Sequence, residues 1–225
     1  MQKAIGVGAI CAAVFAISSV SVQAAPVYDS FGPLAASFGG SGIPNGSVAQ
    51  STVGNDGVMG LTAHQRYANV PAVSNNGAGR FFATAGVDQT NAASIAGNFA
   101  TWNFGFYVDN GSNTGLIYQL FMDVDPTNVQ SYESFGAGSI AGISQDSWNL
   151  GFNSFETLLT YSFNPTLDGV YTFLLTASNS AGAEVKRVSI DVQVGACSNV
   201  PEPGSLSLVG LGLAGVAALR RRKSI

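Results

Sequence analysis

The chain has 225 residues, of which 46% are hydrophobic, only 10% are charged and 28 are glycine. Once the terminal segments are set aside, this length suffices for one domain of β-sandwich size. Residues 25–199 contain four basic and twelve acidic residues, a formal charge of −8. Because nucleic-acid binding needs clustered Lys and Arg, we exclude nucleic acid as a partner.

The first 24 residues have the order of a secretory signal peptide. Lys3 precedes an apolar run over residues 4–20, and small residues follow up to Ala24. This order predicts an N-terminal signal helix that is cleaved between Ala24 and Ala25. The alternative is an uncleaved N-terminal membrane helix, and both interpretations place the rest of the chain outside the cytoplasm.

The segment from residue 25 to residue 76 carries the weakest structural signal. Gly, Ser and Asn interrupt each apolar run before a period develops. We expect one short helix over Val58 to Ala68, with strand or loop elsewhere.

The rest of the body predicts an all-β fold. Val188, Ile190, Val192 and Val194 alternate with polar residues, and the run over 170–178 is separated from them by the turn residues 179–182, so the two form an antiparallel hairpin. Further short strands are expected at residues 80–87, 99–108, 116–124 and 157–163. We predict one antiparallel β-sandwich over residues 25–199, immunoglobulin-like or jelly-roll-like. Asp168 to Phe173 resembles the hairpins that close bacterial immunoglobulin-like modules.

Aromatic residues gather in the middle of the chain. Trp102, Phe104 and Phe106 share one face of a predicted strand because side chains alternate along a strand. The favoured interpretation is that these three rings belong to the core, and the alternative is a platform on which a carbohydrate stacks.

Catalytic signals are sparse. His64 is the one histidine, and we expect it at the surface or in a loop rather than in a catalytic role. Glycoside hydrolysis would need a carboxylate pair such as Asp123 with Asp125 or Glu133 with Glu156. We therefore expect no enzyme and no cofactor.

Two polar clusters could supply oxygen ligands to calcium. One begins at Asp109, and the other contains Asp123 and Asp125. Neither has EF-hand spacing, and turn chemistry alone explains both. We expect no metal and keep these three carboxylates as calcium candidates.

The last 26 residues combine three signals. Val200, Pro201, Glu202 and Pro203 form an extended stretch, because the prolines forbid a regular helix. An apolar run of 16 residues, 204–219, follows and as a helix spans only about 24 Å of a hydrocarbon core of about 30 Å. Basic residues then close the chain: Arg220, Arg221, Arg222 and Lys223. By the positive-inside rule this end is cytoplasmic, so residues 200–225 predict a short transmembrane anchor.

This Pro-Glu-Pro stretch, apolar run and basic end resembles the PEP-CTERM sorting signal of exosortase-processed proteins. The resemblance implies a Gram-negative bacterium that makes extracellular polysaccharide, an exosortase as partner, transient membrane anchoring and removal of the tail. It implies nothing about the activity of the body. Cys197, which is the only cysteine left after Cys11 departs with the signal peptide, either cross-links two chains or stays a free thiol.

Together these patterns predict an exported surface or extracellular-matrix protein with a non-enzymatic structural or interaction role. A carbohydrate-binding adhesin module is the first alternative, and a secreted glycoside hydrolase is the second.

Overall fold

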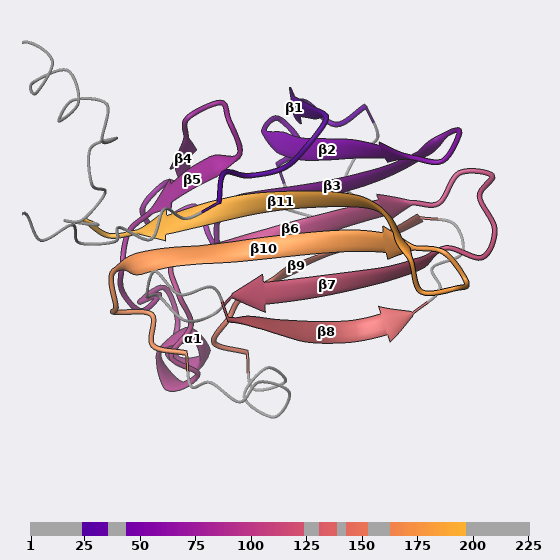
Figure 1. The fold of residues 1–225 in the computed structure, drawn as a ribbon. Coiled ribbons are helices and arrows are strands. Elements are labelled where there is room, and N and C mark those ends of the chain that lie inside the picture. Colours follow the sequence, from indigo (N-terminus) through magenta and orange to yellow (C-terminus); the bar gives the residue numbers. More distant parts are fainter. Residues whose placement is uncertain (1–23, 36–43, 124–130, 139–142, 153–162, 197–225) are drawn as a thin grey trace, which may run out of the picture.

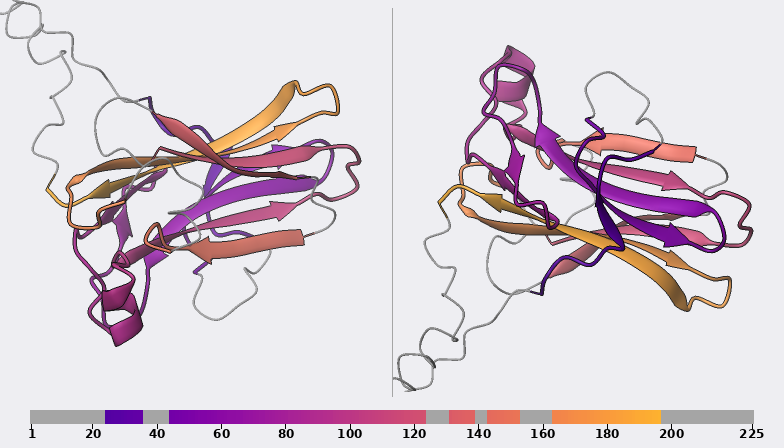
Figure 2. Two further views of the ribbon diagram at one scale, coloured as in Figure 1. Left: turned by 90° about the horizontal axis from the view of Figure 1, so that it is seen from below. Right: turned by 90° about the horizontal axis from the view of Figure 1, so that it is seen from above.

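The computed structural model describes residues 24–35, 44–123, 131–138, 143–152 and 163–196, which form two stacked β-sheets (Figures 1 and 2). Sheet A has the spatial order β1 (Ser30–Gly32), β2 (Val48–Val53), β3 (Gly57–Gln65), β6 (Trp102–Asp109), β9 (Ile143–Trp148). Sheet B has the order β4 (Ser74–Asn75), β5 (Arg80–Ala83), β11 (Glu184–Val194), β10 (Gly169–Ser178), β7 (Ile117–Asp123), β8 (Tyr132–Gly138). Among the described residues, the neighbouring strands pair antiparallel except β5 and β11, which are parallel. The predicted all-β sandwich is confirmed, and one short helix, α1 (Ala92–Ala96), joins the layers.

The predicted hairpin is formed by β10 and β11, which pair along almost their whole length. The Asn179 side-chain oxygen accepts hydrogen bonds from the backbone N–H groups of Ala181 and Ala183. Gly182 adopts a φ of +79°, which a side chain would disfavour. The turn chemistry of residues 179–182 therefore sets the connection, as the sequence predicts.

The other predicted strands are found with shifted limits. β7 lies within the predicted run 116–124, and β6 begins three residues after the start of the predicted run 99–108 and ends one residue beyond it. The run 80–87 is a strand only as far as Ala83, because Gly86 turns away with a φ of +141° and its N–H binds the Pro165 carbonyl. Of the predicted strand 157–163, residues 157–162 lie outside the described residues.

The prediction of a helix over Val58 to Ala68 is wrong, because residues 57–65 form strand β3. Met59, Leu61 and Ala63 alternate along it and all enter the core. Gly60 leaves room on the opposite face, where an added Cβ would lie 2.9 Å from a Val48 methyl group. Pairing with β2 on one side and β6 on the other overrides the weak local helix preference.

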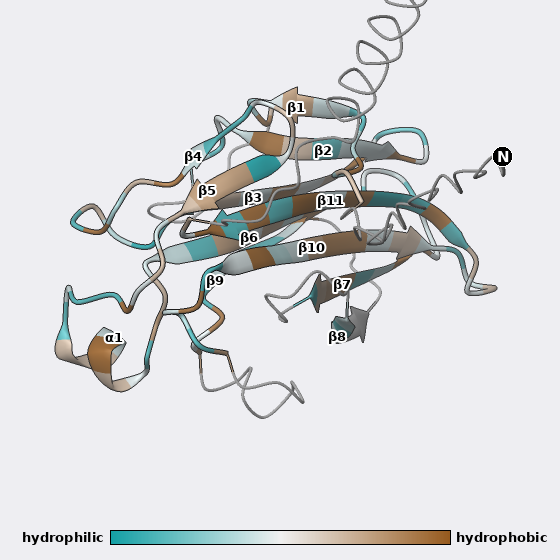
Figure 3. Ribbon diagram, turned by 60° about the vertical axis from the view of Figure 1, so that its left-hand side comes forward, coloured by the Kyte–Doolittle hydropathy of each residue, from teal (hydrophilic) through white to brown (hydrophobic). Residues whose placement is uncertain are grey.

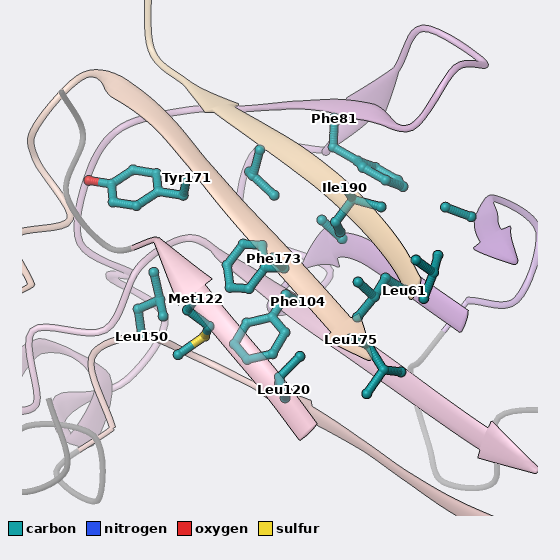
Figure 4. Close-up of a cluster of buried hydrophobic side chains, with 14 of the residues drawn as sticks. Leu61, Phe81, Phe104, Leu120, Met122, Leu150, Tyr171, Phe173, Leu175 and Ile190 are labelled. Atoms are coloured by element: carbon teal, nitrogen blue, oxygen red, sulfur yellow. The ribbon is translucent and has the colours of Figure 1, made fainter. Parts of the chain in front are cut away.

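The core lies between the sheets and is rich in aromatic side chains (Figure 4). The rings of Phe104 and Phe173 stack from opposite sheets at a centroid distance of 4.2 Å, and Trp102 meets Phe173 edge-on at 6.1 Å. Along β11 apolar residues alternate with polar ones (Figure 3), and the apolar members Ile190 and Val192 are fully buried. Burial of these faces supplies most of the driving force for folding.

One end of the sandwich is held by a buried ion pair. Arg66 Nε lies 3.1 Å from an oxygen of Asp88, whose side chain is fully buried. The guanidinium group also lies over the rings of Tyr67, Phe99 and Phe152 at 4.6–5.2 Å. This arrangement fixes the segment that leads into α1 against the end of β3.

Candidate functional site

A cavity of about 430 Å³ lies where the edge of β3 is left free by β2. The β2 pairing covers β3 only as far as Leu61, so among the described residues Thr62 to Gln65 pair with β6 alone. β4 and β5 of sheet B close the other side. The lining consists of Pro44, Gly46, Ser47, Thr62, Ala63, His64, Gln65, Val73, Asn75 and Phe81. Both sheets therefore contribute residues to the lining of this cavity.

The cavity has a buried floor and an exposed rim. Thr62, His64 and Phe81 are at most 6% exposed, whereas Gly46 and Asn75 are exposed. The Thr62 hydroxyl donates a 2.7 Å hydrogen bond to the Ser47 carbonyl, which ties the segment before β2 to the free edge of β3. The floor is thus held in place by strand pairing and by side-chain hydrogen bonds.

His64 is fixed through both ring nitrogens. Nδ1 lies 2.8 Å from the Gln65 carbonyl oxygen, which can only accept, so Nδ1 carries the proton. Nε2 lies 2.9 Å from the Ser147 hydroxyl and accepts its hydrogen bond. Burial lowers the pKa of His64 below its ordinary value of 6.5, against the opposing effect of the hydrogen bond with Gln65. His64 is therefore a neutral, positioned group.

The hydrogen bonds continue from His64 across the face of sheet A. Asn103 donates to the Ser147 hydroxyl at 3.0 Å and accepts from the Asn149 amide at 2.9 Å. Asn149 is fully buried and also bonds the backbone of Ala100, among other groups. These hydrogen bonds connect the three neighbouring strands β3, β6 and β9. The side chains are His64 of β3, Asn103 of β6, Ser147 of β9, and Asn149, the residue after β9.

The expectation that His64 lies at the surface or in a loop is wrong, because it is 6% exposed and lies within β3, one residue before the strand ends. Polar neighbours in the sequence, Thr62, Gln65 and Arg66, gave no sign that His64 is buried. Its partner Ser147 lies 83 positions away in the sequence, so only the sheet pairing brings them together.

The proposed carbohydrate platform fails as a surface. Trp102 and Phe104 are 1% and 0% exposed and belong to the core, and the half-buried Phe106 packs against it. Buried rings cannot stack on a ligand, so the core interpretation holds for these three residues. Side chains alternate along β6, so Trp102, Phe104 and Phe106 face the core, whereas Asn103 and Tyr107 lie on the other face of the strand.

The calcium candidate Asp109 belongs to a loop closed by its own hydrogen bonds. Its carboxylate accepts from the Gly111 N–H, and Asp56 accepts from both the N–H and the hydroxyl of Ser112. Asn113 donates to the Val53 carbonyl at 3.1 Å. Each carboxylate uses one of its oxygens in these bonds, a pattern that turn chemistry alone explains, and calcium binding at Asp109 stays a prediction.

Asp123 has a neighbour that the sequence did not suggest. Strand register aligns Asp123, Thr172, Asp191 and Arg80 in one row across sheet B. Asp191 is fully buried, accepts from the Thr172 hydroxyl at 3.1 Å and lies 2.9 Å from Arg80 Nη2. Burial raises the pKa of Asp191 although Arg80 and Thr172 act in the opposite direction.

Asp125 and Glu156, the suggested partners of Asp123 and Glu133, lie outside the described residues. Within the ranges that the structure describes, no group of three or more His, Cys, Asp or Glu side chains is placed to hold a metal ion. The row on sheet B contributes only two carboxylates, Asp123 and Asp191, separated by Thr172.

The sequence signals at the termini flank this domain. Ala24 and Ala25 are exposed and lie in no strand or helix, and the first backbone bonds to the sandwich are those between Val27 and Ser189. Cleavage between the two alanines stays a prediction. Val200 to Pro203, the predicted helix 204–219, Arg220 to Lys223 and Cys197 lie outside the described residues. In the part of the chain that is described, no helix is long and apolar enough to cross a membrane.

Comparison with known proteins identifies the C-terminal segment. Residues 199–223 match the family model of the PEP-CTERM protein-sorting motif. No curated protein matches the sequence. Among solved structures, the soluble domain of PmoD from Methylocystis sp. is similar at 14% sequence identity, covering 64% of this chain and 95% of that chain, with a TM-score of 0.34.

The sorting-motif match confirms the resemblance predicted from the Pro-Glu-Pro stretch, the apolar run and the basic end. The chain carries a PEP-CTERM sorting motif, which marks it as an exported protein that is processed by an exosortase.

Proposed function

We propose that this chain, as a carrier of the PEP-CTERM motif, is a surface or extracellular-matrix protein whose β-sandwich has a non-enzymatic structural or interaction role. In this proposal the signal peptide directs export, the short C-terminal helix holds the chain transiently in the membrane, and the exosortase removes it. The released body then associates with the extracellular polysaccharide.

The observation that carries this proposal is the position of the motif relative to the fold. β11 lies inside sheet B and ends at Val194, whereas the motif begins at residue 199. Cleavage within the motif therefore removes no described strand. The body can lose its anchor and keep its core, as release at the cell surface requires.

The histidine supports a non-enzymatic role, since both nitrogens of His64 are already engaged. The hydrolase alternative needs two carboxylates that face one cleft. The cavity beside β3 has none in its lining.

The proposal is tested by mass spectrometry of the mature protein purified from cells that contain the exosortase. We expect a C-terminus within or just after residues 199–203 and loss of the basic end. The variant Pro201→Ala should stay in the membrane fraction, whereas Pro71→Ala, which replaces an exposed loop proline, should be processed normally. A mature protein that retains Arg220 to Lys223 would contradict processing.

A further inference from the structure

We propose that the cavity at the free edge of β3 binds a neutral monosaccharide. This inference goes beyond the sorting function and does not depend on it. The volume of about 430 Å³ lies in the lower part of the range of small-ligand pockets, about 300–1,000 Å³.

The charge of the ligand follows from the lining. None of the ten lining residues is Asp, Glu, Lys or Arg. The one titratable group, His64, is held neutral by a carbonyl acceptor at Nδ1 and a hydroxyl donor at Nε2. A charged ligand would lose hydration here and gain no opposite charge in return. The cavity therefore favours a neutral molecule over an ionic one.

The lining is mixed in polarity, as a carbohydrate requires. Pro44, which is exposed, and Val73, which is half-buried, offer apolar surface to the C–H groups of a sugar ring. Gln65 uses its Nε2 on the Tyr67 carbonyl, and Asn75 uses its Oδ1 on the Gly77 N–H. This leaves Gln65 Oε1 as an acceptor and Asn75 Nδ2 as a donor for hydroxyl groups. A purely apolar ligand would leave these two groups without a hydrogen bond to the ligand.

The chamber is ordered before any ligand arrives. Thr62 is tied to Ser47, and His64 is tied through Ser147 to Asn103 on the neighbouring strand. Rigid walls reduce the ordering cost of binding, which matters for a ligand that makes few contacts.

The test measures binding of monosaccharides to the mature protein by saturation-transfer NMR and titration calorimetry. Glucose, galactose and mannose are compared with glucuronate and glucosamine, which keep the ring and add a charge. We expect at least one neutral sugar to bind about tenfold more tightly than either charged analogue.

Matched variants locate the site. Gln65→Ala and Asn75→Ala should each weaken binding by about threefold to tenfold, the loss of one hydrogen bond. Gln89→Ala is the control for Gln65→Ala, because the Gln89 amide also donates to a carbonyl two residues away but lies outside the cavity. Asn164→Ala is the control for Asn75→Ala, because Asn164 Oδ1 also accepts from an N–H two residues away and lies outside the cavity. They should bind as the unaltered protein does.

The proposal is overturned if no neutral sugar binds, if glucuronate or glucosamine binds as tightly as the neutral sugars, or if the control variants weaken binding as much as the cavity variants. Failure of this test leaves the mass spectrometry of the C-terminus unaffected, so the two proposals fail independently.

Discussion

Asn149 should be one of the most sensitive positions in the domain. Its side chain is fully buried. The amide nitrogen donates to the carbonyl oxygens of Ala100 and Trp102 and to the side-chain oxygen of Asn103, at 2.8–2.9 Å. The amide oxygen accepts from the N–H groups of Ala100 and Gly151 at 2.9 and 3.0 Å. The nitrogen has only two hydrogens for three acceptors, so about four full bonds are present. At about 1 kcal/mol each, Asn149→Ala should lower the free energy of unfolding by about 4 kcal/mol. That is a large share of the roughly 5–15 kcal/mol of a typical domain.

Urea unfolding of the mature protein, followed by the fluorescence of Trp102 and Trp148, measures this loss. Asn164→Ala is the control, because the side chain of this exposed asparagine accepts hydrogen bonds from Thr166 within its own turn, and its removal should cost about 0.5 kcal/mol. Asn149→Asp keeps the size and replaces the donor by an oxygen that faces three acceptors, so it should be at least as damaging at neutral pH. A loss below about 1.5 kcal/mol for Asn149→Ala, or a harmless Asn149→Asp, would refute the reasoning.

The remaining predictions concern other buried groups. Since burial lowers the pKa of His64 below 6.5 in the folded state, the unfolded chain binds this proton first, and stability present above pH 6.5 should be lost as the pH falls below it. Urea titrations at pH 7.5 and 5.5 should show this loss in the unaltered protein and a smaller one in His64→Gln. Arg66→Met and Asp88→Asn should each lower the free energy of unfolding by about 3–5 kcal/mol, because each leaves the other partner's buried charge unpaired. In a double-mutant cycle the double variant should lose less than the sum of the two single losses, because it contains no unpaired buried charge at this site. Phe173→Ala should cost about 3–5 kcal/mol and Phe173→Leu clearly less, measured by thermal unfolding, because the smaller cavity loses fewer contacts with Phe104.

Strands with a strong alternation could be predicted from sequence. Val188, Ile190, Val192 and Val194 are all at most 1% exposed, as their period of two requires. β3 escaped prediction for a physical reason. It is central in sheet A and largely buried on both faces, and its outer face mixes Val58 and Gly60 with the polar Thr62 and His64, so no regular alternation of apolar and polar residues appears.

The cavity could not be predicted for a different reason. Its walls come from the segment before β2, the free end of β3, and β4 with β5, and the residue types are ordinary ones. What creates the space is the point at which β2 stops pairing with β3 at Leu61, and register of that kind depends on the whole sheet. The one visible signal was the lone His64, which sequence reasoning placed at the surface.

The low charge of this protein shapes both its interior and its cavity. With only 10% charged residues, the chain uses neutral amides and hydroxyls for several buried backbone groups that strand pairing leaves without a partner, as Asn149 and Thr62 show. Where strands end and backbone groups are exposed, as at the free edge of β3, the surrounding side chains are neutral for the same reason. A chamber built from such groups discriminates by hydrogen bonding and shape rather than by charge. Its affinity for a ligand should therefore depend little on salt, in contrast to any association driven by the net charge of −8 on residues 25–199.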